Sequence, residues 1–454
     1  MDPKQAPKRK LRRHAKSFLD NLHELLTPTL WKQAKNARGQ KKKSPRWATQ
    51  PLVLTLLAMT WCCGDSMAER FETARGFTAV CLRKRRGPGA TVQGFQEALK
   101  ALPICVLRVL AAGVRRRLLA LFDLHHDGFV VFGCDGSSME TPRSEELERR
   151  LDAPVKEHGS PQVWVTALVH LRTGLLWAWH LGQGHNRERS HLQAMLPTLP
   201  AAALVVADAG YNGYDLACTM TQAGVSFLIR MSGKDRLYTE KLLDAATFQE
   251  DTVLLWTKKA QKKKLAPLRV RLIRLRAKDR RDVWLLTNVL DGKRLPAKTA
   301  GQYYRWRWEN EGLFRTFKRT LAKVKLMSRT VRLIHREAEG ALLATQLLLA
   351  QRVQAMGQRP TKKAEPERCS PRKVLLAIRD VIRGKIDVRD PDSFTKRMQE
   401  ATREDRHRTS RKEKREWPRR VNHKPQKPPT FLKLSRHEKA LAHKLLATAT
   451  SAKH

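Results

Sequence analysis

Hydrophobic positions follow two different periods along this chain. Before about residue 125 they recur every three or four residues, as at Phe18, Leu22 and Leu25, which is typical of amphipathic helices. From residue 129 onward the apolar residues form short runs of strand length, namely FVVFGCD, QVWVTALVHL, LLWAWHLG, ALVVAD and VSFLIRM. A helical pattern, NRERSHLQAMLPTL, lies between the third and fourth runs. The order strand, hairpin, helix, strand, helix, strand predicts a mixed α/β sheet.

The N-terminal part predicts short helices. Residues 51–81 are typical of two helices, and Ser66-x-x-Glu69 is a capping box before the second. Gly87, Pro88 and Gly89 then interrupt a basic segment. Two interpretations stay open for this part: a reader of DNA similar to a helix-turn-helix, and an ordinary helical domain.

A second change of pattern begins near residue 236. Three strand-like runs, TVLLWTK, LRVRLIRLR and DVWLLTNVL, alternate with the charged turns KKAQKKK and AKDRRD, which predicts a β-rich insertion. Helices are expected at about 298–325 and 333–356, followed by a linker, an extended basic segment and a last helix, SRHEKALAHKLLA. We therefore expect five regions: 1–125, helical and basic; 126–235, the first part of the α/β core; 236–290, the insertion; 291–357, the second part of the core; and 358–454, the basic linker and C-terminal helical region.

The charge of the chain indicates its partner. The sequence has 90 Lys and Arg against 43 Asp and Glu, a formal net charge of +47, and such a charge repels itself unless it meets a polyanion such as nucleic acid. The basic excess also runs through the folded middle, and no apolar run approaches the length of a membrane span. The N-terminus lacks the apolar core of a signal peptide, so we expect a cytoplasmic protein. Seven cysteines without a CxxC pair favour reduced thiols over disulfides or a zinc finger.

One predicted helix carries an unusual strip of polar residues. If residues 303–321 form a regular helix at about 100° per residue, an apolar face lies beside a narrow strip. That strip contains Tyr304, Arg307, Glu311, Arg315 and Lys318. Glu309 falls elsewhere on the helix. Glu311 is open to two interpretations: surface ion pairs with Arg307 and Arg315, each worth about 0.2–0.5 kcal/mol, or a specific chemical task.

Two aspartates bear on that choice. Asp135 and Asp208 each end a short apolar strand before a turn with small residues, and open α/β sheets place their sites at such strand ends. A single aspartate there is commonly a turn residue. Two of them with a glutamate are three hard-oxygen ligands, suited to two Mg²⁺ or Mn²⁺ ions that activate a nucleophile at a phosphodiester. Basic neighbours on the strip, including Arg315, would then hold the DNA backbone.

At these residues the chain resembles the DDE transposases of bacterial insertion sequences, in particular the IS-four family. The spacing Y-(two)-R-(three)-E-(six)-K of that family is met by Tyr304, Arg307, Glu311 and Lys318. VVADAGYNGY and FGCDGSS resemble the segments around the two catalytic aspartates, and the resemblance covers about 129–345.

The resemblance implies an RNase H-like mixed-sheet core with a β-rich insertion, flanked by helical N- and C-terminal regions. It also implies magnesium-dependent nicking at transposon ends and joining of the 3′ ends to target DNA. Asp135, Asp208 and Glu311 would ligate metal, and Tyr304, Arg307 and Lys318 would contact DNA near the cut.

Further expectations follow from the same resemblance. Excision can pass through a DNA hairpin with a base flipped against a tryptophan; Trp284 is a candidate, although VWLLTNV is typical of a core strand. Two ends must be paired, so we expect a homodimer on double-stranded DNA, acting at the bacterial nucleoid. Two alternatives remain: a catalytically idle, domesticated DNA-binding regulator, and a structure-specific nuclease of the same fold, against which the Tyr-to-Lys spacing argues.

Overall fold

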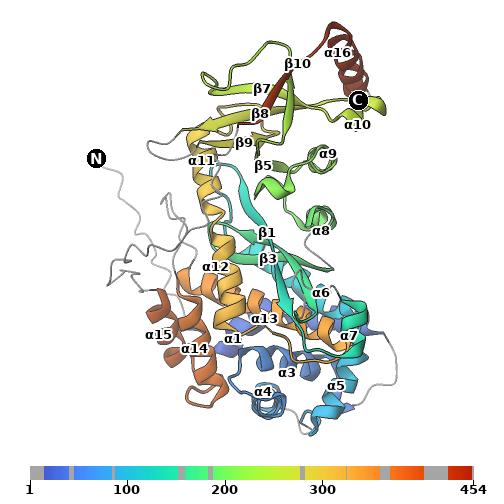
Figure 1. Ribbon diagram of the computed structural model, residues 1–454. Coiled ribbons are helices and arrows are strands. Elements are labelled where there is room, and N and C mark those ends of the chain that lie inside the picture. The colour runs from blue at the N-terminus through green and yellow to red at the C-terminus, as the bar shows by residue number, and fades with distance from the viewer. Residues whose placement is uncertain are drawn as a thin grey trace, which may run out of the picture. The chain divides into compact units, whose positions relative to one another are not determined.

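The computed structural model describes most of the chain, which folds into two compact units (Figure 1). The described residues are 15–39, 45–83, 87–151, 159–182, 188–276, 282–323, 325–357, 369–402 and 428–451. Much of the expected linker and basic C-terminal segment, together with residues 1–14, lies outside these ranges. None of the described helices is both long and apolar enough to cross a membrane.

The first unit is helical. Its elements are α1 (Phe18–Leu25), α2 (Pro28–Arg38), the 3₁₀ turn η1 (Pro45–Trp47), α3 (Thr49–Trp61), α4 (Met67–Leu82), α5 (Val92–Lys100), most of α6 (Ile104–Leu121), the end of α13 (Val331–Met356), α14 (Pro371–Ile382) and α15 (Pro391–Thr402). Helix α3 is buried on nearly every side, which makes it the centre of this unit. The Ser66 hydroxyl accepts a hydrogen bond from the Glu69 amide at 3.1 Å, as expected for the N-cap of α4.

The C-terminal part of the chain divides between the two units, which differs from the single region 358–454 expected from the sequence. The Phe18 ring of α1 meets the Phe394 ring of α15 edge to face at 5.6 Å. Arg379 of α14 donates a hydrogen bond to the Trp61 carbonyl of α3 at 2.8 Å. These contacts join residues more than 300 positions apart, which local periodicity does not reveal.

The second unit is built on one sheet that contains all ten described strands, in the order β10-β6-β7-β8-β9-β5-β4-β1-β2-β3. The strands are β1 (Val130–Glu140), β2 (Gln162–His170), β3 (Leu175–Gly182), β4 (Ala203–Ala207), β5 (Ser226–Arg230), β6 (Arg236–Thr239), β7 (Glu250–Leu255), β8 (Leu268–Leu275), β9 (Val283–Thr287) and β10 (Thr430–Lys433). Strands β1, β4 and β5 are parallel neighbours, while β1, β2 and β3 form an antiparallel meander. The expected mixed α/β sheet is therefore confirmed.

The strands between residues 236 and 287 extend the same sheet. Strand β9 pairs antiparallel with β5, and β8, β7 and β6 follow outward. Strand β10 then adds to β6 in parallel, although it lies near the C-terminus (Figure 1). The sequence patterns predicted β7, β8 and β9 but neither β6 nor β10, because a four-residue strand has too few positions to show a period.

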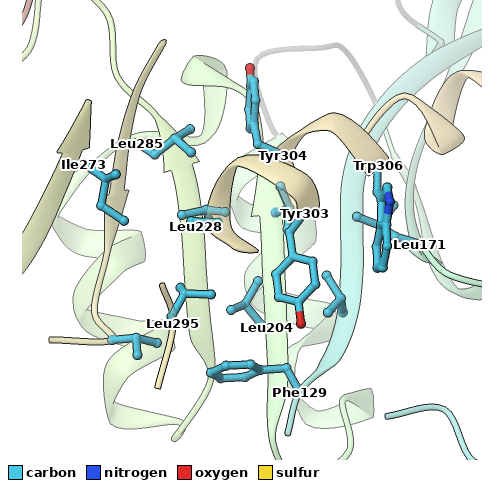
Figure 2. Close-up of a cluster of buried hydrophobic side chains, with 14 residues drawn as sticks. Phe129, Leu171, Leu204, Leu228, Ile273, Leu285, Leu295, Tyr303, Tyr304 and Trp306 are labelled. Atoms are coloured by element: carbon cyan, nitrogen blue, oxygen red, sulfur yellow. The ribbon is translucent and has the colours of Figure 1, made fainter. Parts of the chain in front are cut away.

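The second unit also contains helices. They are α7 (Glu145–Arg150), α8 (Glu188–Met195), α9 (Tyr214–Gln222), α10 (Lys258–Lys262), α11 (Ala297–Trp306), α12 (Glu309–Arg315), the first part of α13, and α16 (Arg436–Ser451). Helix α11 packs on a core cluster drawn from several strands, including Phe129, Leu204, Leu228 and Leu285 (Figure 2). The Tyr303 hydroxyl donates to the His126 carbonyl at 2.9 Å, and Figure 2 shows the Tyr304 hydroxyl pointing the opposite way.

Candidate active site

The two predicted aspartates are neighbours across a parallel strand pair. Gly133 of β1 is in register with Val206 of β4, so Asp135 and Asp208, each two residues further along, lie at matching positions. Adjacent strands are about 4.8 Å apart, and in-register residues of parallel strands project from the same face. The fold therefore brings together two carboxylates that are 73 positions apart in the sequence.

The two carboxyl groups have different surroundings. Asp135 is partly buried and accepts a hydrogen bond from the Gly136 amide at 2.9 Å. Burial raises the pKa of Asp135, the charges of Asp208 and Glu311 add to the rise, and the Gly136 amide and Arg307 oppose it. These effects place Asp208 and Glu311 within electrostatic range of Asp135.

Asp208 is the more exposed acid, and two arginines flank it. One carboxylate oxygen accepts a hydrogen bond from the Ala209 amide at 2.8 Å. The Arg230 guanidinium lies 3.8 Å from Oδ1, and the Arg307 guanidinium lies 3.9 Å from Oδ2. The carboxylate is therefore held between two cations at a distance typical of loose ion pairs.

The helix that carries Glu311 is interrupted, unlike the regular helix expected for residues 303–321. Helix α11 ends at Trp306 and α12 begins at Glu309. Between them the amides of Arg307 and Trp308 bond to carbonyls three residues back, at 3.3 Å each, and this tighter pattern continues to Glu311. After α12 comes the π-helical turn η5 (Thr316–Thr320), in which the Leu321 amide bonds five residues back.

These irregular turns change the predicted strip. A tight turn overwinds the helix and a π turn underwinds it, so a constant 100° per residue does not hold across this segment. Arg307 and Glu311 lie within electrostatic range of Asp135, and Tyr304 within range of Asp208. Burial lowers the pKa of Lys318, and the acid that counters this is Glu140, the last residue of β1. Lys318 therefore lies beside the far end of β1.

Tyr304 and Arg307 form one layer beside the acids. The Arg307 guanidinium carbon is 5.4 Å from the Tyr304 ring centre and 5.6 Å from the Trp308 ring centre. Burial raises the pKa of Tyr304, the Asp208 charge adds to the rise, and Arg307 and Arg230 oppose it. Trp308 is 60% exposed, which leaves part of its ring open to solvent beside this layer.

The interior side of α12 rests on bare backbone of β1. Asn310 is completely buried, and a Cβ added to Gly133 would lie 2.6 Å from both Oδ1 and Nδ2 of its amide. Among the described residues neither amide atom has a hydrogen-bond partner. A buried polar group left unpaired costs roughly 1–3 kcal/mol, so this position is energetically unfavourable for asparagine.

The two remaining predicted residues, Arg315 and Trp284, differ in exposure. Arg315 is exposed at the end of α12. Trp284 is 6% exposed, with its ring centre 5.4 Å from Phe248 and 6.0 Å from Phe431, and Arg274 lies over its face. This packing favours the core-strand interpretation of Trp284 over a surface that stacks on DNA.

Known transposases are similar in sequence to this chain. Residues 128–347, from just before β1 into α13, match the family described as "Transposase DDE domain". "Transposase InsG for insertion sequence element IS4" of Escherichia coli (strain K12) is 25% identical over 422 residues, which is 84% of this chain and 88% of that protein. Residues 128–347 therefore match the DDE domain of transposases, and the chain as a whole is similar to a transposase of an IS4 element. The resemblance stated from the sequence is thereby confirmed.

A solved structure shows a more distant likeness to this transposase. It is described as "Cryo-EM structure of piggyBac transposase synaptic complex with hairpin DNA", and it covers 89% of this chain and 86% of its own. The identity is 11% and the TM-score 0.42. A likeness of this degree carries no conclusion about fold, partners or assembly.

Two residues of the transposase site escaped the sequence interpretation. Arg230 ends β5 at the position level with Asp208, because Ala207 pairs with Ile229 one residue earlier. The available signal was that VSFLIR, like FVVFGCD and ALVVAD, is a short apolar run ending in a charged residue. Asn310 offered no such signal, because its burial on Gly133 depends on the packing of α12.

Proposed function

We propose that this transposase cuts at the inverted-repeat ends of an insertion sequence by metal-dependent phosphodiester hydrolysis and joins the 3′ ends to target DNA. The observation that carries the proposal is the in-register pair Asp135 and Asp208, with Glu311 in electrostatic range. Acids so placed repel one another, and a bound cation would relieve that repulsion. The family match over residues 128–347 supports the same interpretation.

The core is RNase H-like in this proposal. The strand order β3-β2-β1-β4-β5, with the first three antiparallel and the last three parallel, supports this assignment. The insertion follows β5, and α12 returns to β1 with Glu311. The acids thus come from two central strands and one later helix.

Asp135, Asp208 and Glu311 are the proposed ligands of two Mg²⁺ or Mn²⁺ ions, whose oxygen preference they fit. The raised pKa of Asp135 marks a place where positive charge is favourable. Within the described ranges, no three His, Cys, Asp or Glu side chains gather closely enough to hold an ion, so we propose that the ligands converge when DNA is present. Bound metal would supply a polarised nucleophile and stabilise the leaving oxygen.

The surrounding side chains hold the substrate. Arg307 and Arg230, now paired loosely with Asp208, are placed to receive phosphate oxygens near the scissile bond. The Tyr304 ring packs beside the Arg307 guanidinium. The resemblance implied that Lys318 contacts DNA near the cut. Because Lys318 lies beside Glu140 at the far end of β1, we propose instead that it and Arg315 contact the backbone further from the cut, and we assign Trp284 to the core.

Pairing of two ends requires two active sites, so we propose that a homodimer acts on double-stranded DNA at the bacterial nucleoid. The formal charge of +47 supports a large electrostatic share in that binding.

A cleavage assay with a matched pair of glutamate variants tests the proposal. Duplexes bearing the inverted repeats that flank the coding sequence are mixed with protein and Mg²⁺. We expect Asp135→Ala and Glu311→Ala to lose cleavage by at least about 1,000-fold while DNA binding persists, since the ligand set would be incomplete. Glu309→Ala, two residues from Glu311 on the same helix, should cleave normally.

Equal cleavage by wild type and Asp135→Ala would overturn the assigned site. Binding without cleavage by the wild type in both Mg²⁺ and Mn²⁺ would instead favour the domesticated regulator.

A further inference from the structure

The contact between Asn310 and Gly133 joins the two segments that carry proposed ligands. Asn310 immediately precedes Glu311 on α12, and Gly133 lies two residues before Asp135 on the same face of β1. A side chain at position 133 would collide with the Asn310 amide and with Leu171 Cδ2, at 2.6 Å in each case. Glycine at 133 is therefore what allows the amide to lie against the strand.

Packing does not explain why residue 310 is an asparagine. Its amide is fully buried, and neither Oδ1 nor Nδ2 has a partner in the described part of the chain. A leucine has the same branched arrangement of four side-chain heavy atoms and would leave no polar atoms unpaired. The amide therefore needs a partner that this arrangement does not provide.

The segment around Asn310 is suited to a small movement. Helix α12 has seven residues, with the tight turn at Arg307 and Trp308 before it and the π turn η5 after it. Both kinds of irregular turn can absorb a change of winding without unfolding the helix between them. Glu311 is exposed, and the three acids are near one another without converging.

We propose that Asn310 is a positioning residue whose amide Nδ2 donates a hydrogen bond to the Asp135 carboxylate when α12 advances along β1. The nearest acid along that face of β1 is Asp135, and a shift of a few ångströms would bring the amide towards it. The same movement carries Glu311 towards Asp135 and Asp208. This inference rests on the proposed function and adds to it the device that closes the site.

Metal binding without turnover gives the first test. Mn²⁺ affinity is measured by electron paramagnetic resonance for wild type, Asn310→Leu and Gln351→Leu, each bound to a non-cleavable duplex. Gln351 is the matched control, because it is also fully buried with both amide atoms unpaired but lies on α13. We expect Asn310→Leu to weaken Mn²⁺ binding by about 10- to 100-fold, as loss of a hydrogen bond to a charged group would. Gln351→Leu should bind Mn²⁺ like the wild type.

Thermal unfolding without metal and DNA gives the second test. Both leucine variants should melt higher than the wild type, by about 2–4 °C, because each removes an unpaired buried amide. A purely structural role for Asn310 predicts a lower melting temperature for Asn310→Leu instead.

The glycine partner supplies an independent check. Gly133→Ala should lower the melting temperature more in the presence of Asn310 than in the Asn310→Ala background, where the collision with the amide is gone and only that with Leu171 Cδ2 remains. Gly133→Ala and Asn310→Ala should both bind Mn²⁺ more weakly than the wild type. The Asn310 amide is displaced in the first variant and absent in the second.

The outcomes separate this inference from the proposed function. If Asn310→Leu binds Mn²⁺ and cleaves as the wild type does while Asp135→Ala is inactive, Asn310 has no positioning role and the assigned acids stand. If Asp135→Ala cleaves normally, the function itself fails and this inference fails with it.

Discussion

Single residues divide into those that the sequence identifies and those that depend on neighbours across the sheet. Asp135, Asp208 and Glu311 stand out in the sequence, because each is an acid at the end of a strand run or in a spaced helical motif. Arg230 becomes significant only when β5 is placed beside β4, because its distance to Asp208, 3.8 Å, arises from strand pairing. The type of a side chain is a property of the local sequence, whereas the neighbours that shift its charge or pKa can come from any part of the chain.

Replacing Arg230 should change the affinity for metal and the affinity for DNA in opposite directions. In Arg230→Ala the Asp208 carboxylate loses a nearby positive charge, worth about 1 kcal/mol at this distance in a partly solvated site. Mn²⁺ affinity should therefore rise about fivefold, while affinity for end-containing DNA falls by about tenfold. Metal titration and DNA titration of the same protein measure the two effects. Arg269→Ala on β8 serves as control, and a fall in both affinities would contradict the assigned position.

His170 makes the stability of the second unit sensitive to mild acid. Its ring is fully buried between Thr173 Oγ1 at 2.8 Å and the Leu124 carbonyl at 3.0 Å, and burial lowers its pKa to about 4. Unfolded histidine titrates near 6.5, so the stabilisation is complete above that pH and is lost as the pH falls from about 6.5 to 4. The total loss is roughly 3 kcal/mol.

Urea unfolding at pH 7 and pH 5 checks this prediction. The wild type should lose about 2 kcal/mol more than His170→Gln over this interval, because glutamine has no proton to gain. Parallel pH dependence in the two proteins would show that His170 is not the titrating group.

Elements were predicted best where many residues repeat one pattern. The strands β1 to β5 and β7 to β9 follow clear apolar runs, and the structure contains them. The helix at 303–321 was expected to be continuous because its apolar period is regular, but the backbone tightens at Arg307 and widens at η5. Packing on β1 through Asn310 and Gly133 accompanies this irregularity, and periodicity carries no information about it.

Strand β10 pairs with β6, and helix α16 is attached beside them by ion pairs to Glu240. Glu240 lies 2.7 Å from Lys439 Nζ and 2.8 Å from His443 Nε2 of α16. Hydrogen bonds from Lys439 and His443 lower the pKa of Glu240 to about 2. The contribution is present above the ordinary glutamate pKa near 4.5 and disappears as the pH falls towards 2.

Glu240→Gln should loosen α16 without unfolding the sheet. Exposed ion pairs contribute about 0.2–1 kcal/mol each, so hydrogen exchange of the α16 amides should accelerate about two- to tenfold. High salt should produce the same acceleration in the wild type by screening the pairs. Asp251→Asn on β7 removes the same charge as a control, and equal exchange in both variants would argue against the attachment.

At the scale of the whole molecule, we expect the excess of basic residues to contribute more to DNA binding than any single contact does. The run KKAQKKK, noted in the sequence as a charged turn, forms α10 and the turn after it. Its exposed lysines are Lys258, Lys259, Lys262, Lys263 and Lys264. The Tyr214 hydroxyl donates to the Ala266 carbonyl at 2.5 Å, which ties this turn to the helix that follows the Asp208 loop. These five lysines therefore form an exposed positive surface on α10 and the turn after it.

Replacing the five lysines by glutamine should reduce the salt dependence of DNA binding. Each phosphate neutralised contributes about −0.9 to the slope of log affinity against log salt concentration, so the slope should become less steep by up to about 4.5. Fluorescence anisotropy at several salt concentrations measures it. The five Lys→Arg changes keep the charge and should leave the slope unchanged; an unchanged slope in the glutamine protein would show that α10 does not meet DNA.

The sequence by itself indicated the class of protein, predicted the mixed α/β sheet and singled out the three acids as candidates. It could do so because residue type, spacing and apolar period are properties of short segments. The tertiary structure decided that Asp135 and Asp208 lie in register, that two arginines flank Asp208, and that an unpaired Asn310 amide lies on Gly133. It also decided that β10 joins the sheet and that α14 and α15 pack with the N-terminal helices. Each of these depends on which distant segments share a surface, and pairing across tens or hundreds of residues is set by the packing of the whole unit.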